Sequence, residues 1–275
     1  MNYDILKEHT LNKIINSSID KLPFHHLFIT DILDKQLYSS LKEKSKFYND
    51  KKYKMGRCQD NKLFINHKFP IINSSDETLK LFYKLFADNE IKTALVNKFF
   101  INSKEFIDKI SIFDKECEFV YTEANKFQSI HVDIPSKFVS LVFYLPNDDD
   151  NLDDETQLKN GTILYDKHIN PVYKSRYIPN SVCIFAQHFY SYHGFDTTIP
   201  RNALVMFYVH SDFIAEDLKP SPEKKSEIEN KIFKQSIFNK LKIYKLIEYN
   251  DKYLNQEHKK CKINNNKGRV TFYHL

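Results

Sequence analysis

Two stretches of this chain, residues 138–145 and 203–209, are almost continuously apolar. Apolar runs of this length fit β-strands that are covered on both faces better than strands with one face in water. From residue 118 onward, similar short runs of β-branched and aromatic residues alternate with polar loops, at residues 119–121, 162–165, 172–178 and 182–186. Several short strands at this spacing predict a β-sandwich or barrel.

The regions on either side of this β-rich part show helical periodicity instead. Before it, apolar residues recur at helical spacing in two groups: Ile32, Leu33, Leu37 and Leu41, and then Leu79, Leu81, Phe82, Leu85, Phe86, Leu95, Phe99 and Phe100. After it, the same spacing returns in Ile228, Ile232, Phe233, Ile237, Leu241 and Tyr244. We therefore predict an α-rich region over residues 1–115 that packs on the core, a β core over 116–215, and a basic helical tail over 216–275.

An acidic segment, residues 147–156, lies between two of the predicted strands, and six of its ten residues are Asp or Glu. We interpret it as a solvated hairpin loop, because clustered like charges favour water over a packed environment. A contact with a cation or with a substrate is the alternative.

Charge and composition argue against several classes of protein. The formal net charge is +5, and residues 216–275 hold 14 Lys and Arg against 8 Asp and Glu, so the positive excess lies in the tail and gives only weak support to nucleic-acid binding. No apolar run reaches the roughly 18 residues needed to span a bilayer, and no secretory signal is visible, so we expect a cytoplasmic protein. Four widely spaced cysteines predict free thiols. Nucleotide-binding glycine motifs are absent from the sequence.

One short motif carries metal chemistry. His131 and Asp133 flank Val132 in a β-like stretch, and alternate residues of a strand point to the same face, so an imidazole and a carboxylate converge. A second, distant histidine would complete the triad of two histidines and one carboxylate that holds iron(II) and leaves coordination positions open. His193 is our candidate for that histidine.

A second His-x-Asp match, His210-Ser211-Asp212, competes with this motif. A chain of this composition has about 0.8 such matches by chance, so the motif alone is weak. The second match lies at the end of the last predicted strand, and a charged helical tail follows it. Only His131 is followed by several predicted strands that lead to another histidine.

The wider context of His131 resembles a known family. The residues that carry the resemblance are His131, Asp133, Lys137, Ser140, Phe143-Tyr144-Leu145, Gly161-Thr162, Tyr192-His193-Gly194 and Arg201, with the lead-in Pro23-Phe24-His25-His26-Leu27 and Asp31. His193 lies 60 positions after Asp133, and Arg201 lies eight positions after His193. Over residues 20–212 the chain resembles the iron(II)- and 2-oxoglutarate-dependent oxygenases, in their prolyl-4-hydroxylase-like branch.

The resemblance implies a mostly β fold with α-helices: a double-stranded β-helix, or jelly roll, with N-terminal helices and a C-terminal helical tail. It also implies iron(II) at His131, Asp133 and His193, and 2-oxoglutarate with its far carboxylate on Arg201. The physical chemistry of Arg201 agrees, because a guanidinium at the start of a buried strand is costly unless it meets an anion. A dicarboxylate supplies that anion through a bidentate pair.

Two further residues, Tyr121 and Gln128, lie on the stretch that approaches the metal motif. We expect them to hydrogen-bond the cosubstrate, with ordinary packing as the alternative.

The family's reaction uses O2 and 2-oxoglutarate, releases succinate and CO2, and hydroxylates a C–H bond; ascorbate is a candidate stimulant. The substrate stays open: a small molecule, a biosynthetic intermediate or a protein side chain. One alternative is a cupin-like metalloenzyme that does not use 2-oxoglutarate, against which Arg201 argues. Another is a non-catalytic β-helix protein that binds a partner or nucleic acid through the basic tail.

Overall fold

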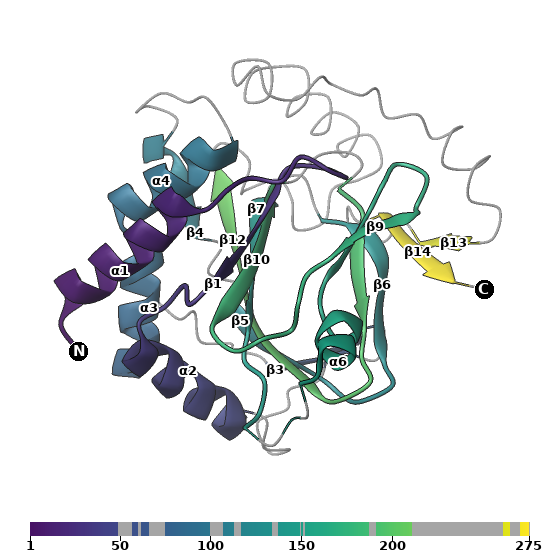
Figure 1. The fold of residues 1–275 in the computed structure, drawn as a ribbon, viewed down its shortest axis with the longest axis horizontal. Coiled ribbons are helices and arrows are strands. Elements are labelled where there is room, and N and C mark those ends of the chain that lie inside the picture. Colours follow the sequence, from purple (N-terminus) through teal and green to yellow (C-terminus); the bar gives the residue numbers. More distant parts are fainter. Residues whose placement is uncertain are drawn as a thin grey trace.

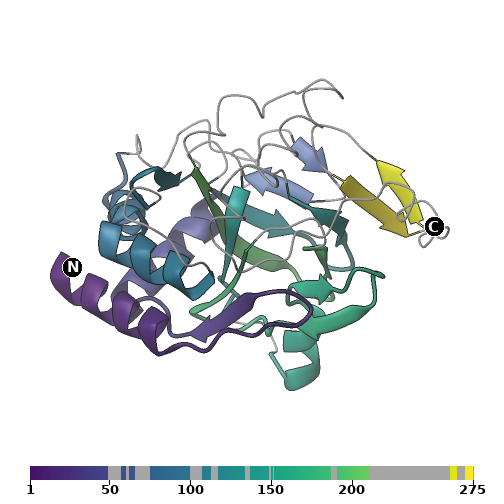
Figure 2. The same ribbon diagram turned by 90° about the horizontal axis from the view of Figure 1, so that it is seen from above.

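The computed structural model describes residues 1–48, 57–59, 62–65, 75–99, 107–112, 117–133, 137–148, 150, 152–186, 191–210, 261–264 and 270–274. These residues form two antiparallel β-sheets, with a layer of helices on the outside of one sheet (Figures 1 and 2). Within this part of the chain, no helix is long and apolar enough to cross a membrane.

The larger sheet has eight strands in the order β1, β10, β7, β12, β5, β3, β2, with β4 paired to β12. Their bounds are β1 His26–Thr30, β2 Arg57–Gln59, β3 Lys62–Ile65, β4 Ile110–Ile112, β5 Glu118–Thr122, β7 Lys137–Tyr144, β10 Ser181–Ala186 and β12 Arg201–His210. The smaller sheet has six strands in the order β13, β14, β6, β11, β8, β9. Their bounds are β6 Phe127–Val132, β8 Ile163–Tyr165, β9 Pro171–Lys174, β11 His193–Asp196, β13 Cys261–Asn264 and β14 Val270–His274. The predicted double-stranded β-helix is confirmed.

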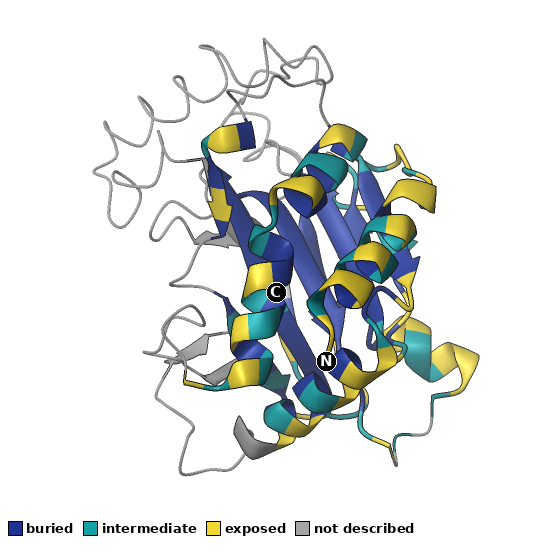
Figure 3. Ribbon diagram, turned by 90° about the vertical axis from the view of Figure 1, so that its left-hand side faces the viewer, coloured by how far each residue is buried: buried dark blue, intermediate teal, exposed yellow. Residues whose placement is uncertain are grey.

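Four N-terminal helices cover the outer face of the larger sheet, and their buried sides face it (Figure 3). They are α1 Tyr3–Asn16, α2 Lys35–Tyr48, α3 Glu77–Ala87 and α4 Asn89–Phe99. Asp76 begins α3 by accepting hydrogen bonds from the backbone N–H groups of Thr78 and Leu79, which satisfies two donors that the helix leaves unpaired. The Phe82 and Phe86 rings of α3 lie 5.3 Å and 5.1 Å from the ring of Phe143 on the sheet.

Strand β7 is buried along its whole length, as its apolar run predicts. Leu141 and Phe143 belong to the core shared with the helices, whereas Val142 and Tyr144 belong to the core between the two sheets. Alternate residues therefore serve two different cores, which explains why this strand does not alternate between apolar and polar residues. The inner residues of β7 are thereby free to line a site.

Three regions differ from the sequence-based expectation. The region expected to be α-rich also contains β1 to β4, which join the larger sheet. The acidic segment is not a simple hairpin loop: Asp153 caps a short helix, α6 (Asp154–Lys159), and Asp148 forms an ion pair with Lys42 of α2. The tail was expected to be helical, but its described parts are β13 and β14; the predicted helical stretch 228–244 lies outside the described residues. The domain boundaries remain a prediction.

Gly161, between α6 and β8, packs closely against the backbone of Ser175, which follows β9. A Cβ atom at this position would lie 1.7 Å from the backbone carbonyl oxygen of Ser175. Since backbone cannot swing aside as a flexible side chain can, Gly161→Ala should lower the free energy of unfolding by at least about 2 kcal/mol. Chemical denaturation measures this, with Lys159→Ala, an exposed position two residues earlier, as a control that should stay within about 0.5 kcal/mol of wild type. A Gly161→Ala protein as stable as wild type would contradict the packing described here.

Candidate metal centre

Two adjacent strands of the smaller sheet bring the two candidate histidines together. In the antiparallel pairing of β6 with β11, His131 lies directly opposite His193, and the ring centroids are 4.3 Å apart. Asp133 follows the end of β6, two residues after His131, so its side chain returns to the same face. All three side chains are buried.

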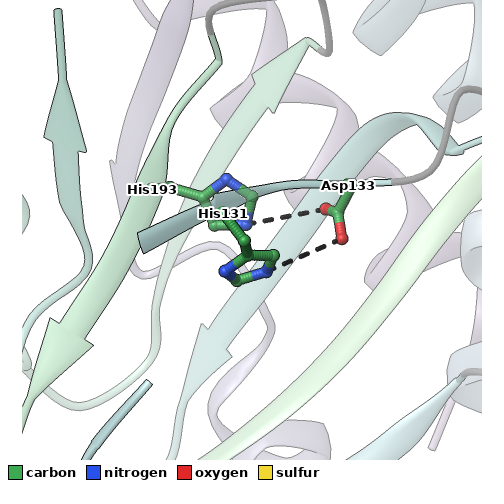
Figure 4. Close-up of side chains that lie close together, drawn as sticks. All are labelled: His131, Asp133 and His193. Carbon is green, nitrogen blue, oxygen red and sulfur yellow. Dashed lines mark ion pairs between the residues drawn. The ribbon is translucent and has the colours of Figure 1, made fainter. Parts of the chain in front are cut away.

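The three side chains converge on one point (Figure 4). Nε2 of His131 lies 3.9 Å from Oδ1 of Asp133, and Nε2 of His193 lies 3.6 Å from Oδ2. One donor atom from each residue lies within 4.8 Å of the other two, a spacing that a single metal ion could bridge. Two imidazole nitrogens and one carboxylate oxygen on one side of an ion form the facial arrangement that suits iron(II).

A backbone contact fixes the proton on His193. Its Nδ1 lies 2.9 Å from the carbonyl oxygen of Ser191. Because a carbonyl only accepts, Nδ1 must carry the proton, and the lone pair of Nε2 then points toward Asp133 and His131. The ring also packs on Phe185, with centroids 4.6 Å apart. His193 is therefore held in the tautomer that a metal ligand needs.

The triad lies in a pocket between the two sheets that Arg201 also lines. Arg201 begins β12, and its side chain is 1% exposed. Its Nε donates to the carbonyl oxygen of Asn160 at 3.0 Å, its Nη2 donates to Oγ1 of Thr162 at 3.4 Å, and its guanidinium carbon lies 3.9 Å from the Phe195 ring centroid. Within the described part of the chain, no Asp or Glu forms an ion pair with Arg201.

Neutral hydroxyl groups surround Arg201. The Tyr144 hydroxyl lies 2.7 Å from Oγ1 of Thr162 and 2.6 Å from Oγ of Ser175, and burial raises the pKa of Tyr144, so the phenol stays protonated. Thr122 lies opposite Arg201 across β5 and β12, and its buried hydroxyl has no hydrogen-bond partner among the described residues. Among the described residues, the contacts of Arg201 are thus neutral carbonyl and hydroxyl groups and aromatic rings, and no carboxylate pairs with it.

Comparisons with known proteins place this fold. A prolyl hydroxylase from Trichoplax adhaerens, solved with a hypoxia-inducible factor peptide, is 12% identical, with a TM-score of 0.51 over 76% of this chain and 91% of that one. The two chains share a fold. A prolyl-4-hydroxylase from Pseudomonas putida is 8% identical, with a TM-score of 0.48 over 74% of this chain and 98% of that one. No protein-family model and no curated protein sequence matches the chain.

The structure places the two expected cosubstrate residues differently. Gln128 is buried and lines the pocket beside the triad, and its contact with the cosubstrate stays a prediction. Tyr121 does not line this pocket: its register partner is Asn202, and its side chain packs against the core shared with the helices. Strand β5 turns its even-numbered residues inward, so Thr122 takes the position beside Arg201, and the predicted contact of Tyr121 with the cosubstrate gains no support from this packing.

Sequence reasoning did not assign Thr122 and Tyr144 to the site. Alternate residues of β5 and β7 lie on the same face as Arg201, and Thr122 and Tyr144 are among them. Identifying them requires the pairing of these strands with β12, which the sequence does not give. Of the competing motif, the structure describes only the backbone of His210, which pairs with Ile110 of β4. The side chain of His210 and the whole of Asp212 lie outside the described residues.

The triad generates a direct test. His131→Ala, Asp133→Ala and His193→Ala should each abolish binding of Fe²⁺, or of Mn²⁺ as a redox-stable probe, because two remaining ligands hold the ion too weakly. Anaerobic calorimetric titration measures the binding, and circular dichroism checks the fold. The exposed His168→Ala and the competing-motif variants His210→Ala and Asp212→Ala should bind like wild type. Metal binding that disappeared only in His210→Ala or Asp212→Ala would move the site to that motif.

Proposed function

We propose that this protein is an iron(II)- and 2-oxoglutarate-dependent oxygenase that hydroxylates a C–H bond, with release of succinate and CO2. One observation carries the proposal: a buried arginine, with no acidic partner in the described part of the chain, lines the same pocket as a histidine–aspartate–histidine cluster. The cluster alone suits many metal proteins, whereas the arginine calls for an anionic ligand beside the metal.

The charge of Arg201 is the reason to expect an anionic ligand in this pocket. An unpaired guanidinium in a low-dielectric interior costs several kcal/mol, and carbonyl and hydroxyl contacts offset only part of this cost. A carboxylate bound at Arg201 removes the remainder through a charge-assisted pair. The buried hydroxyl of Thr122, which has no hydrogen-bond partner among the described residues, is suited to donate to the same carboxylate.

A ligand with one end on Arg201 and the other at the triad must carry two separated anionic or chelating groups. 2-Oxoglutarate has a carboxylate at one end and a keto acid at the other, so it meets both requirements. Bound iron(II) supplies the activation of O2. His131, Asp133 and His193 would hold that metal, and Gln128 lies within the same pocket to contact the bound acid.

Much of the remaining pocket lining is apolar and excludes water from the reaction, and Glu118 of β5 adds a carboxylate to it. The apolar residues are Val142, Val205, Phe185, Phe195 and Phe207. An apolar wall strengthens the electrostatic contacts of the ligands and protects a reactive site from side reactions.

The substrate class is a small molecule or a biosynthetic intermediate, with a protein side chain as the alternative. The similar protein from Trichoplax was solved with a peptide, which supports the alternative. A cupin-like enzyme without 2-oxoglutarate leaves the burial of Arg201 unexplained. A non-catalytic binding protein leaves both Arg201 and the convergence of the triad unexplained.

Turnover of the cosubstrate tests the proposal without knowledge of the substrate. Purified protein with Fe²⁺, ascorbate, O2 and 2-oxoglutarate should release succinate slowly, because many such enzymes would be expected to turn over uncoupled when no substrate fills the pocket. His131→Ala should release none. A wild-type protein that binds iron but neither binds nor consumes 2-oxoglutarate would overturn the proposal.

Arg201→Ala should weaken 2-oxoglutarate binding and leave metal binding nearly unchanged, because the metal ligands stay in place. Truncating one partner of a desolvated charge pair costs about 2–5 kcal/mol, or roughly 30-fold or more in affinity. Arg201→Lys should restore only part of the affinity for 2-oxoglutarate, since an ammonium lacks the planar pair of N–H donors of a guanidinium. Anaerobic titration of 2-oxoglutarate into the iron(II) protein, followed by metal-to-ligand absorption, measures the affinity. Arg176→Ala, which removes an exposed arginine paired with Asp154, is the matched control.

A further inference from the structure

We infer that Ser140 and Lys137 of β7 are positioning residues that hold the two oxygens of Asp133 separately, so that this carboxylate offers the metal a single oxygen. The inference rests on the proposed function, in which Asp133 is a metal ligand. It concerns residues that do not themselves belong to the triad.

Ser140 holds one oxygen of the carboxylate. Its Oγ donates a hydrogen bond to Oδ2 of Asp133 at 2.9 Å, and both residues are buried. The neighbours of Ser140 across the sheet are Phe185 on one side and Phe207 on the other. A hydroxyl in such apolar surroundings is costly without a partner, so its bond to Asp133 is a strong restraint on the carboxylate plane.

Lys137 holds the other oxygen. Its Nζ lies 3.8 Å from Oδ1 of Asp133 and 3.7 Å from the ring centroid of Phe207, and its side chain is 0% exposed. A lysine this deeply buried is rare unless its charge is compensated. The negative charge of Asp133 and the face of Phe207 provide that compensation.

An irregularity in β7 brings Lys137 to this position. Lys137 and Ser140 are three residues apart, so in a regular strand they would point to opposite faces. The pairing of β7 with β12 shifts register between Tyr208 and Val209, and the consecutive residues Phe138 and Val139 both belong to the helix-side core. This β-bulge turns Lys137 to the pocket side, where it reaches Asp133, and bulges beside active sites commonly re-aim a side chain in this way.

The consequence concerns the open coordination positions. A carboxylate can bind a metal through one oxygen or through both. A second oxygen on the metal would occupy a position that the cosubstrate or O2 needs. With Ser140 on one oxygen and Lys137 beside the other, rotation of the carboxylate into a symmetric two-oxygen contact would break a buried hydrogen bond and separate a buried ion pair.

Co²⁺ is the probe, because its visible absorption reports both affinity and coordination. Ser140→Ala should bind Co²⁺ about tenfold more weakly than wild type, as other partners of metal ligands do when removed, and with a changed visible spectrum. Ser140→Thr keeps the hydroxyl and should restore both. Ser181→Ala is the matched control, since Ser181 is buried, donates to the carbonyl of Ile178 and begins β10, four residues before Phe185, the register partner of Ser140. It should lose similar stability and bind Co²⁺ like wild type.

Lys137→Met, which keeps the length of the side chain and removes its charge, should change the Co²⁺ spectrum in the same direction as Ser140→Ala. Should this variant not fold, the Ser140 series decides alone. A Ser140→Ala protein with the affinity and spectrum of wild type would overturn the inference while the proposed function stands. A wild-type protein that binds no divalent metal would overturn both.

Discussion

The pairing of β6 with β11 is the contact on which the rest of the site depends. It sets His131 opposite His193, although 62 positions separate them in the chain, and it aims the following Asp133 at both imidazoles. A slip of one residue would turn His131 to the other face of the sheet. Gly194 lies within a register shift of this pairing, and a Cβ atom there would lie 2.8 Å from the carbonyl oxygen of Gln128. The close approach of the two strands thus depends on a residue without a side chain.

The larger sheet can face this pair with polar residues because the helices supply a second core behind it. Leu141 and Phe143 pack outward on the helices, so the fold does not rely on the inner face alone for apolar burial. Ser140 and Tyr144, on the inner face, can then carry hydroxyl groups that contact Asp133 and the surroundings of Arg201. Strand β7 thus packs on the helices with one face and contacts the candidate site with the other.

The two buried cations of the site illustrate different solutions to the same electrostatic problem. Lys137 lies beside Asp133, so its charge is compensated within the protein. Arg201 has only neutral acceptors and aromatic faces among the described residues, and in the proposed function the carboxylate of a ligand compensates its charge. A buried charge is unfavourable unless it is compensated. Lys137 therefore has a structural role beside Asp133, whereas the proposed role of Arg201 is to bind an anionic ligand.

The sequence by itself determined the β core, the helices that precede it, the three residues of the candidate metal centre and Arg201, because apolar runs, helical periodicity and motif spacing are local properties of the chain. The tertiary structure decided which residues of each strand face the pocket. Period-two alternation in β5 does not state whether Tyr121 or Thr122 points inward; pairing with β12 does. The bulge that aims Lys137 at Asp133, the addition of β1 to the larger sheet and the pairing of β14 with β6 have the same origin. Each is fixed by the partner strand, and a distant partner leaves no mark in the local sequence pattern.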